Sequence, residues 1–244
     1  MMKNVFLLIS VVTVMTASAQ TKPVQKKPAT VSKPTVQKAV APVASERLVE
    51  ITTDYGTMIA KLYNQTPLHR DNFIKLVQSG FYDSLLFHRV IKEFMIQGGD
   101  PGSKNAPDSI MLGAGSAPGD RIPAEFRPNF FHKKGALAAA RDGNPAKASS
   151  NCQFYIVEGK KIDTAQLNNI YNQGVKQNNP SFKYSKAQKE IYERIGGTAF
   201  LDQNYTVFGE VISGIDVIDK IASVQTKPGD RPEKNVMMKM RMLN

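Results

Sequence analysis

The run from Phe87 to Asp100 constrains the fold more than any other stretch of the chain. It places an arginine, large apolar side chains and an amide at nearly alternating positions, and it ends in a Gly-Gly-Asp turn. Side chains at positions i and i+2 of an extended strand share a face. The residues expected on one face, on either side of an irregular turn at Lys92-Glu93, are Arg89, Ile91, Met95 and Gln97. That face would be mostly apolar, with a cation at one end and an amide at the other.

Alternating residues predict strands elsewhere as well. Leu48 to Asn64 predicts a hairpin that turns at Asp54-Tyr55-Gly56. A final half-buried strand is predicted by the alternation of charged residues with Val236, Met238, Met240 and Met242. Strands outnumber helices, so the fold class is expected to be mainly β. A closed antiparallel β-barrel capped by helices satisfies the pattern without exposed edges, although periodicity alone leaves a sandwich open.

Helix signals are fewer. Thr66-Pro67 predicts a helix start, with the threonine as N-cap and the proline at the first helical position, and Gly80 lies where a C-terminal cap belongs. The predicted apolar face of this helix consists of Leu68, Phe73, Leu76 and Val77. A short helix is expected after Gly214, and residues 98–119 are expected to be a glycine-rich loop held by backbone turns more than by side chains.

Residues 1–19 have the features of a secretory signal peptide. Lys3 precedes an apolar run from Val5 to Met15, and Ala17-Ser18-Ala19 follows, so cleavage is expected before Gln20. The run is too short to span a bilayer comfortably, and no stable membrane insertion is expected after cleavage. A buried N-terminal strand is the alternative.

Residues 20–45 are rich in proline and lysine and predict a disordered linker. Residues 1–45 hold six lysines and no acidic residue, which leaves 26 basic and 21 acidic groups in the rest of the chain. Residues 1–45 therefore carry +6 of the net charge of +11. Weak contact of the linker with anionic envelope components is one functional interpretation. Nucleic-acid binding is not expected, because no aromatic residues are interleaved with these charges.

The run from Phe87 to Asp100 closely resembles the signature of the cyclophilin-type peptidyl-prolyl cis-trans isomerases. Three further blocks resemble the family in the right order, namely Gly135–Arg141, Ser150–Ile156, and Leu201-Asp202 with Tyr205–Gly209. The resemblance extends from about Leu48 to Leu243. It implies the barrel instead of the sandwich, and it implies one isomerase domain over residues 46–244.

The resemblance implies a catalyst of rotation about X-Pro bonds, which interconvert over tens of seconds or more without one. A twisted amide restores the lone pair of the proline nitrogen, so a cation aimed at that nitrogen favours the transition state. By resemblance, Arg89 is this cation, and Phe94, Met95 and Leu201 form the proline pocket. Gln97 and Gln153 match the amides that contact substrate and position the arginine.

The resemblance implies further substrate-binding positions and also shows departures. Ala140 and Arg141 match the adjoining wall of the groove. Tyr155 replaces the usual phenylalanine and adds a hydroxyl that needs a partner if it is buried. Phe200 and Tyr205 replace the tryptophan and histidine of many eukaryotic members, as in bacterial envelope members, which puts tight cyclosporin binding in doubt. His88 is expected on the opposite face of the strand from Arg89, as a hydrogen-bonded structural histidine.

Residues 160–197 do not belong to the common family plan and predict a two-helix insertion. The second helix has a capping box, Ser185 with Gln188, and ends at Gly196-Gly197. One interpretation is a helical hairpin that merely packs on the barrel. The other is a lid or docking element, because the segment leads directly into Phe200-Leu201 beside the expected groove.

These observations predict an exported prolyl isomerase, in a bacterial periplasm, that acts on proline-containing unfolded or partly folded polypeptides. The alternative is a non-catalytic proline-peptide binding or chaperone-like adaptor module. No cofactor and no metal is expected, because the chain has no P-loop, no clustered Cys/His and no dinucleotide fingerprint. Cys152 is expected to be a small buried side chain.

Overall fold

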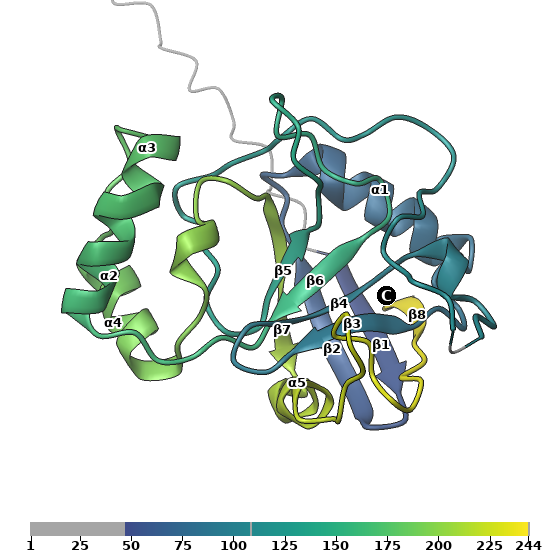
Figure 1. Cartoon of the computed structure of the whole chain (residues 1–244). Helices are drawn as coiled ribbons and strands as arrows, with labels where there is room; N and C mark the ends of the chain where they lie inside the picture. Colours follow the sequence, from purple (N-terminus) through teal and green to yellow (C-terminus); the bar gives the residue numbers. More distant parts are fainter. Residues whose placement is uncertain (1–46, 108, 244) are drawn as a thin grey trace, which may run out of the picture. The chain divides into compact units, whose positions relative to one another are not determined.

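The structure is a computed structural model that describes residues 47–107 and 109–243. The predicted signal peptide and linker lie outside these residues. The described chain is mainly β, with a curled antiparallel sheet of eight strands in the order β3-β4-β6-β5-β7-β2-β1-β8 (Figure 1). The strands are β1 (Arg47–Thr53), β2 (Gly56–Leu62), β3 (Phe87–Ile91), β4 (Met95–Gly98), β5 (Ala136–Ala139), β6 (Phe154–Val157), β7 (Val207–Ser213) and β8 (Lys239–Leu243).

The predicted hairpin is confirmed, because β1 pairs with β2 from Arg47 opposite Leu62 to Thr53 opposite Gly56. Helix α1 (Pro67–Gln78) follows with proline in its first turn. Thr66 is the N-cap residue, as predicted, but its hydroxyl donates to the Tyr63 carbonyl at 3.3 Å and does not cap the helix. Of the predicted apolar face, Phe73 and Val77 belong to the core and Leu76 packs against it. Leu68 was predicted wrongly, because it is 50% exposed.

The run from Phe87 to Gly98 is a hairpin and not one strand with an irregular turn. β3 pairs antiparallel with β4, so Arg89 lies opposite Gln97 and Ile91 lies opposite Met95. The chain reverses where Glu93 adopts a φ of 61°. β4 continues the sheet to β6, with Gln97 opposite Tyr155. The register therefore aligns Arg89, Gln97 and Tyr155 in one row across three strands, on one face of the sheet.

The two faces of the sheet carry different apolar clusters. The larger cluster, which includes Ile96 and Phe154, packs against α1 and α5 (Ile215–Ala222). The smaller cluster includes Met95 and Tyr155, whose side chains point to the opposite face from those of their chain neighbours. The residues at the two ends of the strand order also meet, because the Phe87 amide donates to the Val236 carbonyl and the Met238 amide donates to the Leu85 carbonyl, each at 2.9 Å.

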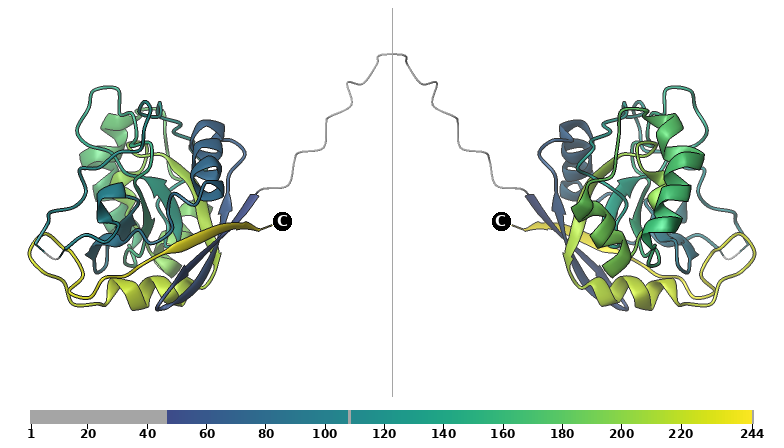
Figure 2. Two further views of the ribbon diagram at one scale, coloured as in Figure 1. Left: turned by 90° about the vertical axis from the view of Figure 1, so that its right-hand side faces the viewer. Right: turned by 90° about the vertical axis from the view of Figure 1, so that its left-hand side faces the viewer.

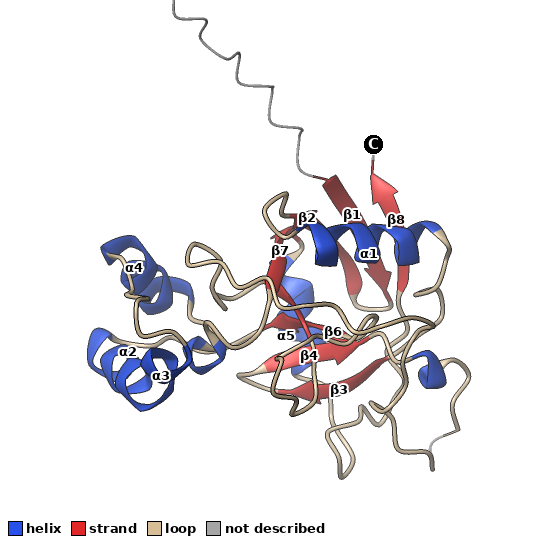
Figure 3. Cartoon of the chain, turned by 90° about the horizontal axis from the view of Figure 1, so that it is seen from above, coloured by secondary structure: helices blue, strands red, loops and turns tan. Residues whose placement is uncertain are grey.

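Residues 160–197 form a helical segment beside the sheet, on the other side from α1 in the view of Figure 3. Its helices are α2 (Thr164–Ile170), a π-helical turn (Tyr171–Val175), α3 (Lys176–Asn178) and α4 (Lys186–Ile195). The capping box of Ser185 and Gln188 is confirmed. The first of the two predicted helices continues from α2 through the π turn into α3. Figure 2 shows the helical segment, in green, from two opposite sides. A third apolar cluster, with Phe131, Leu167 and Tyr192 at its centre, joins the segment to the rest of the domain.

The glycine-rich loop is held by side chains, which corrects the expectation of backbone turns. The Asp100 carboxylate accepts from the Gly102 amide at 2.7 Å and caps a 3₁₀ turn, Pro101–Ser103. It also accepts from the Gly113 amide. Arg231, which is 7% exposed, donates to the carbonyls of Pro107 and Ile110 at 3.0 Å each. The loop is thus fixed at several points by charged side chains outside its glycines.

Candidate active site

A cavity of about 580 Å³ opens over the row of Arg89, Gln97 and Tyr155, on the face opposite the main core. Nine of the eleven predicted site residues line it, namely Arg89, Phe94, Met95, Gln97, Ala140, Arg141, Tyr155, Leu201 and Tyr205. Gln153 lines a neighbouring cavity of about 890 Å³. Phe200 lines neither of these two cavities and is 52% exposed. Most of the residues predicted from the sequence therefore line one concave site.

Arg89 lies between a carboxylate and an amide. Its Nε donates to Asp230 Oδ2 at 3.3 Å, and its Nη1 donates to Gln97 Oε1 at 3.4 Å. The Gln97 amide then donates to Gln153 Oε1 at 3.1 Å. Gln153 is fixed in turn by donating to the carbonyls of Gly113 and Gly115 at 2.9 and 2.8 Å. Hydrogen bonds thus link the guanidinium, through two amides, to the glycine-rich loop.

The apolar part of the cavity is built from three separate elements. Met95, from β4, is buried, and Leu201, from the 3₁₀ turn Ala199–Leu201, is 9% exposed. The Phe94 ring lies at the end of the β3-β4 turn and packs on the Phe200 ring, with centroids 5.5 Å apart. Phe200 therefore supports a lining residue without lining the cavity itself.

Tyr155 has the hydrogen-bond partner that its burial requires. Its hydroxyl lies 2.9 Å from Nε2 of His132, and the residue is 5% exposed. Burial raises the pKa of the Tyr155 hydroxyl well above its ordinary value, so the group stays protonated. The floor of the cavity thus combines an apolar ring with one satisfied hydroxyl.

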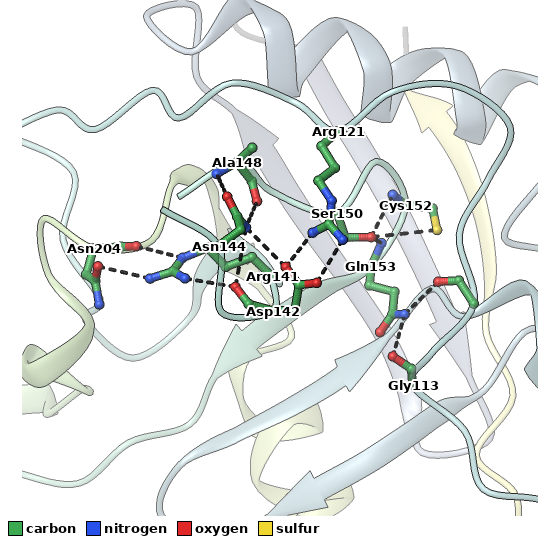
Figure 4. A network of polar contacts seen from close by, with 11 residues as sticks. Gly113, Arg121, Arg141, Asp142, Asn144, Ala148, Ser150, Cys152, Gln153 and Asn204 are labelled. Carbon is green, nitrogen blue, oxygen red and sulfur yellow. Dashed lines mark hydrogen bonds and ion pairs between the residues drawn. The ribbon is translucent and has the colours of Figure 1, made fainter. Parts of the chain in front are cut away.

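The wall at Arg141 is held by polar contacts (Figure 4). Its guanidinium donates to the Asn204 side chain at 3.0 Å and lies 4.4 Å from the centroid of the Tyr205 ring. Beyond it, Arg121 and Asp142 form an ion pair beside the second cavity, and Asn144 bridges Asp142 to Ala148. Arg141 and Tyr205 therefore stabilise each other where the two cavities adjoin.

His88 lines the same cavity, and the expectation of a hydrogen-bonded histidine is wrong. Neither ring nitrogen has a hydrogen-bond partner in the part of the chain that the structure describes, although the residue is 3% exposed. Burial lowers the pKa of the His88 imidazole to about 4. The ring is therefore neutral near pH 7.

Two loops line the cavity that the sequence did not assign to it. Ile110, Met111 and Leu112 come from the glycine-rich loop, and the loop before β8 contributes Lys227, Pro228, Gly229 and Arg231. A sequence signal for the first loop was present, because three consecutive large apolar residues stand in an otherwise polar loop. The sequence carried no such signal for Asp230, because Asp230 and Arg89, which it contacts, are 141 positions apart.

Neither a metal-binding cluster nor a membrane-spanning helix is found within residues 47–107 and 109–243. No group of three or more His, Cys, Asp or Glu side chains there is arranged to hold an ion. No helix in the same residues is long and apolar enough to cross a membrane.

The fold and the cavity define a β-sheet protein with a peptide-sized site on one face of the sheet. The sequence model described as "Cyclophilin type peptidyl-prolyl cis-trans isomerase/CLD" matches residues 48–241. The chain therefore belongs to the cyclophilin-type peptidyl-prolyl cis-trans isomerases.

Curated relatives agree with this assignment. A Staphylococcus aureus protein, named as a candidate peptidyl-prolyl cis-trans isomerase, is 34% identical over 191 residues, which cover 78% of this chain and 88% of that protein. A similarly named Staphylococcus haemolyticus protein is 32% identical over 195 residues, 80% of this chain and 89% of that protein.

Solved structures show the same fold. A cyclophilin-type peptidyl-prolyl cis-trans isomerase of Cryptosporidium parvum superposes with a TM-score of 0.58 at 23% identity, over 82% of this chain and 98% of that one. A second structure of that protein, determined in the presence of the dipeptide Ala-Pro, gives a TM-score of 0.56 at 22% identity, over 81% of this chain and 99% of that one.

Proposed function

We propose that the protein accelerates rotation about X-Pro bonds by electrostatic stabilisation of the twisted amide by Arg89, with the proline ring held against Phe94, Met95 and Leu201. The observation that carries this proposal is a guanidinium that lines the same cavity, of about 580 Å³, as the apolar side chains of Phe94, Met95 and Leu201. An arginine stays charged and presents a rigid set of donors. Its side chain is 41% exposed, so an incoming peptide reaches it without disrupting a buried ion pair.

The hydrogen bonds around Arg89 support the assignment of roles. Gln97 and Asp230 occupy Nη1 and Nε, which fixes the plane of the guanidinium and leaves Nη2 without a partner in the described residues. Only interactions that are stronger in the transition state than in the ground state accelerate the reaction. Rotation restores the lone pair on the proline nitrogen, and a donor directed at that nitrogen meets this condition.

We infer that the substrates are unfolded or partly folded proteins outside the cytoplasm, in a bacterial periplasm. The support is the signal-peptide pattern of residues 1–19. Proline-containing segments fit the apolar cavity, and the Cryptosporidium parvum structure determined with Ala-Pro gives a small probe for this site. We also infer that the sheet closes as a barrel, supported by the backbone hydrogen bonds between Leu85–Phe87 and Val236–Met238.

The test is the cis-to-trans rate of a short Ala-Pro peptide with the mature protein and with Arg89→Ala. We expect the unmutated protein to accelerate isomerisation and the variant to lose most of that acceleration, by 10-fold or more, which corresponds to about 1.4 kcal/mol or more of transition-state stabilisation. Arg127→Ala is a matched control, because Arg127 is an exposed arginine that bonds to backbone carbonyls away from the cavity.

Two outcomes would contradict the proposal in different ways. Acceleration that survives in Arg89→Ala would leave an isomerase but reject the role of the arginine. A folded, unmutated protein that binds the peptide without accelerating its rotation would favour the non-catalytic binding module.

A further inference from the structure

Asp202 is a buried carboxylate that directly follows Leu201, a residue of the apolar cavity wall. It is 0% exposed and accepts four hydrogen bonds. His132 supplies two of them, from its backbone amide at 2.8 Å and from Nδ1 at 2.7 Å. The hydroxyls of Tyr184 and Tyr192 supply the others, at 2.7 and 2.6 Å. Burying a carboxylate is costly unless donors replace its water, so these four bonds fix its place.

The same hydrogen bonds continue to the floor of the cavity. Because Nδ1 of His132 faces the carboxylate, it carries a proton, and Nε2 is directed at the Tyr155 hydroxyl at 2.9 Å. The His132 and Tyr155 rings are also nearly parallel, with an interplanar angle of 13°. A buried chain of contacts, which we call the Asp202 network, therefore runs from Tyr192 through Asp202 and His132 to Tyr155.

The helical segment also holds the main chain around Asp202. The single proton of the Tyr184 hydroxyl is shared between Asp202 and the Ala199 carbonyl, which lies 3.2 Å from the hydroxyl oxygen. The Asn179 side chain donates to the Gln203 side chain at 2.9 Å. Residues 198–205 supply Leu201 and Tyr205 to the cavity. The helical segment, residues 160–197, is thus bonded on both sides of the turn that carries two lining residues.

We propose that Tyr192 and Tyr184 are positioning residues for the proline-binding cavity, which act through Asp202 on Leu201 and Tyr155. This inference rests on the proposed function, because it assigns substrate binding to that cavity. It gives the helical segment a role that neither interpretation of its sequence included: the segment supports the active site. Arg89 is held by Gln97 and Asp230, outside the Asp202 network, so the network acts on peptide binding more than on rotation.

The experiment compares Tyr192→Phe, Tyr184→Phe and the double variant with Tyr171→Phe. Tyr171 is a matched control, since it lies in the same helical segment and its hydroxyl donates to the Phe182 carbonyl at 2.9 Å. We expect the double variant to raise KM for an Ala-Pro peptide about three- to tenfold, with kcat changed less than about twofold. The control variant should leave both constants unchanged. Thermal melts establish that each variant is folded.

A spectroscopic readout separates positioning from general loss of stability. The methyl resonances of Leu201 should shift in Tyr192→Phe and in the double variant, and not in Tyr171→Phe. If Tyr192→Phe does not fold, Tyr184→Phe carries the test, because Tyr184 is only partly buried. An unchanged KM and unchanged Leu201 resonances in every variant at Tyr184 or Tyr192 that folds would overturn the inference.

Failure of the proposed function is distinguishable from failure of this inference. If the unmutated protein binds the peptide without accelerating its rotation, the proposed function fails. The inference is then decided by the dissociation constant of the same peptide, measured by NMR titration. A three- to tenfold weaker affinity in the double variant supports it, and an unchanged affinity overturns it.

Discussion

At the scale of single residues, the ion pair between Arg89 and Asp230 leaves the arginine available to substrate. The two side chains are 41% and 44% exposed, and their one contact is 3.3 Å long. Exposed pairs of this kind contribute about 0–1 kcal/mol to stability. A substrate that approaches the guanidinium therefore competes with a weak interaction, and Asp230 orients Arg89 more than it neutralises it.

The low pKa of His88 predicts that the protein loses stability at mildly acidic pH. Its pKa is about 4 in the folded protein, since burial disfavours the charged ring, and about 6.5 when the chain is unfolded. Between these values the unfolded chain binds a proton that the folded protein does not. Stability therefore falls as the pH drops from about 6.5 to about 4, by about 3 kcal/mol in total from this residue. Chemical denaturation at pH 7, 6 and 5 measures the slope.

The variant His88→Gln isolates this contribution. Burial also lowers the pKa of His69, so the unmutated protein contains more than one such group. We expect a smaller decrease in the free energy of unfolding between pH 7 and pH 5 for His88→Gln than for the unmutated protein. Equal decreases in the two proteins would show that the His88 pKa is not depressed.

At the scale of elements, a buried arginine from a distant part of the chain is one of the side chains that fix the loop carrying Met111. Arg231 bonds to the carbonyls of Ala106, Pro107 and Ile110. Met111 is 91% exposed at the edge of the cavity, where its flexible side chain is suited to varied apolar partners. The loop is thus anchored at its base, with an apolar tip at the entrance to the site.

Replacing Arg231 should loosen this loop. Arg231→Met removes the donors and leaves buried carbonyls unpaired, so we expect a loss of about 2–3 kcal/mol in the free energy of unfolding. Limited proteolysis should cut between Ala106 and Leu112 faster than in the unmutated protein. Arg127→Met is the control, because Arg127 is exposed and its replacement should lower the free energy of unfolding by less than about 1 kcal/mol. Proteolysis at an unchanged rate would argue that the loop is held by its glycine turns.

One part of the site follows from a local sequence pattern, whereas the family resemblance supplied the other predicted residues. Arg89, Met95 and Gln97 are close in sequence, and a strand period of two places them on one face whether the run is one strand or a hairpin. The hairpin itself was missed because the short turn at Lys92–Phe94 interrupts the alternation only slightly. Local patterns therefore predicted the apolar face and the cation correctly.

The parts that sequence missed depend on contacts between distant segments. Asp230 and Arg231 reach the site only because the loop before β8 lies against β3 in the folded chain. The sequence predicted that the Tyr155 hydroxyl needs a hydrogen-bond partner if it is buried. It did not identify His132 as that partner, because 23 positions separate the two residues. The family resemblance supplied most of the lining residues but not these pairings.

At the scale of the whole molecule, catalysis should be independent of the first 45 residues. The residues that line the cavity lie between His88 and Arg231, and β1 begins at Arg47. We expect a chain that begins at Glu46 to have the same kcat/KM for an Ala-Pro peptide as the chain that begins at Gln20, within about twofold, since an uncharged short peptide gains little from distant lysines in 0.15 M salt.

The chains that begin at Gln20 and at Glu46 should differ in their binding to an anionic surface. The segment from Gln20 to Ser45 carries five of the six lysines and no acidic residue. Each basic side chain near an anionic membrane contributes about 1 kcal/mol, and salt screens this attraction. At low salt we expect the longer chain to sediment with phosphatidylglycerol vesicles more than the shorter one, and 0.5 M salt should abolish the difference. Equal sedimentation at low salt would assign the segment a spacer role alone. A lower kcat/KM in the shorter chain would instead show that these residues contribute to the active site.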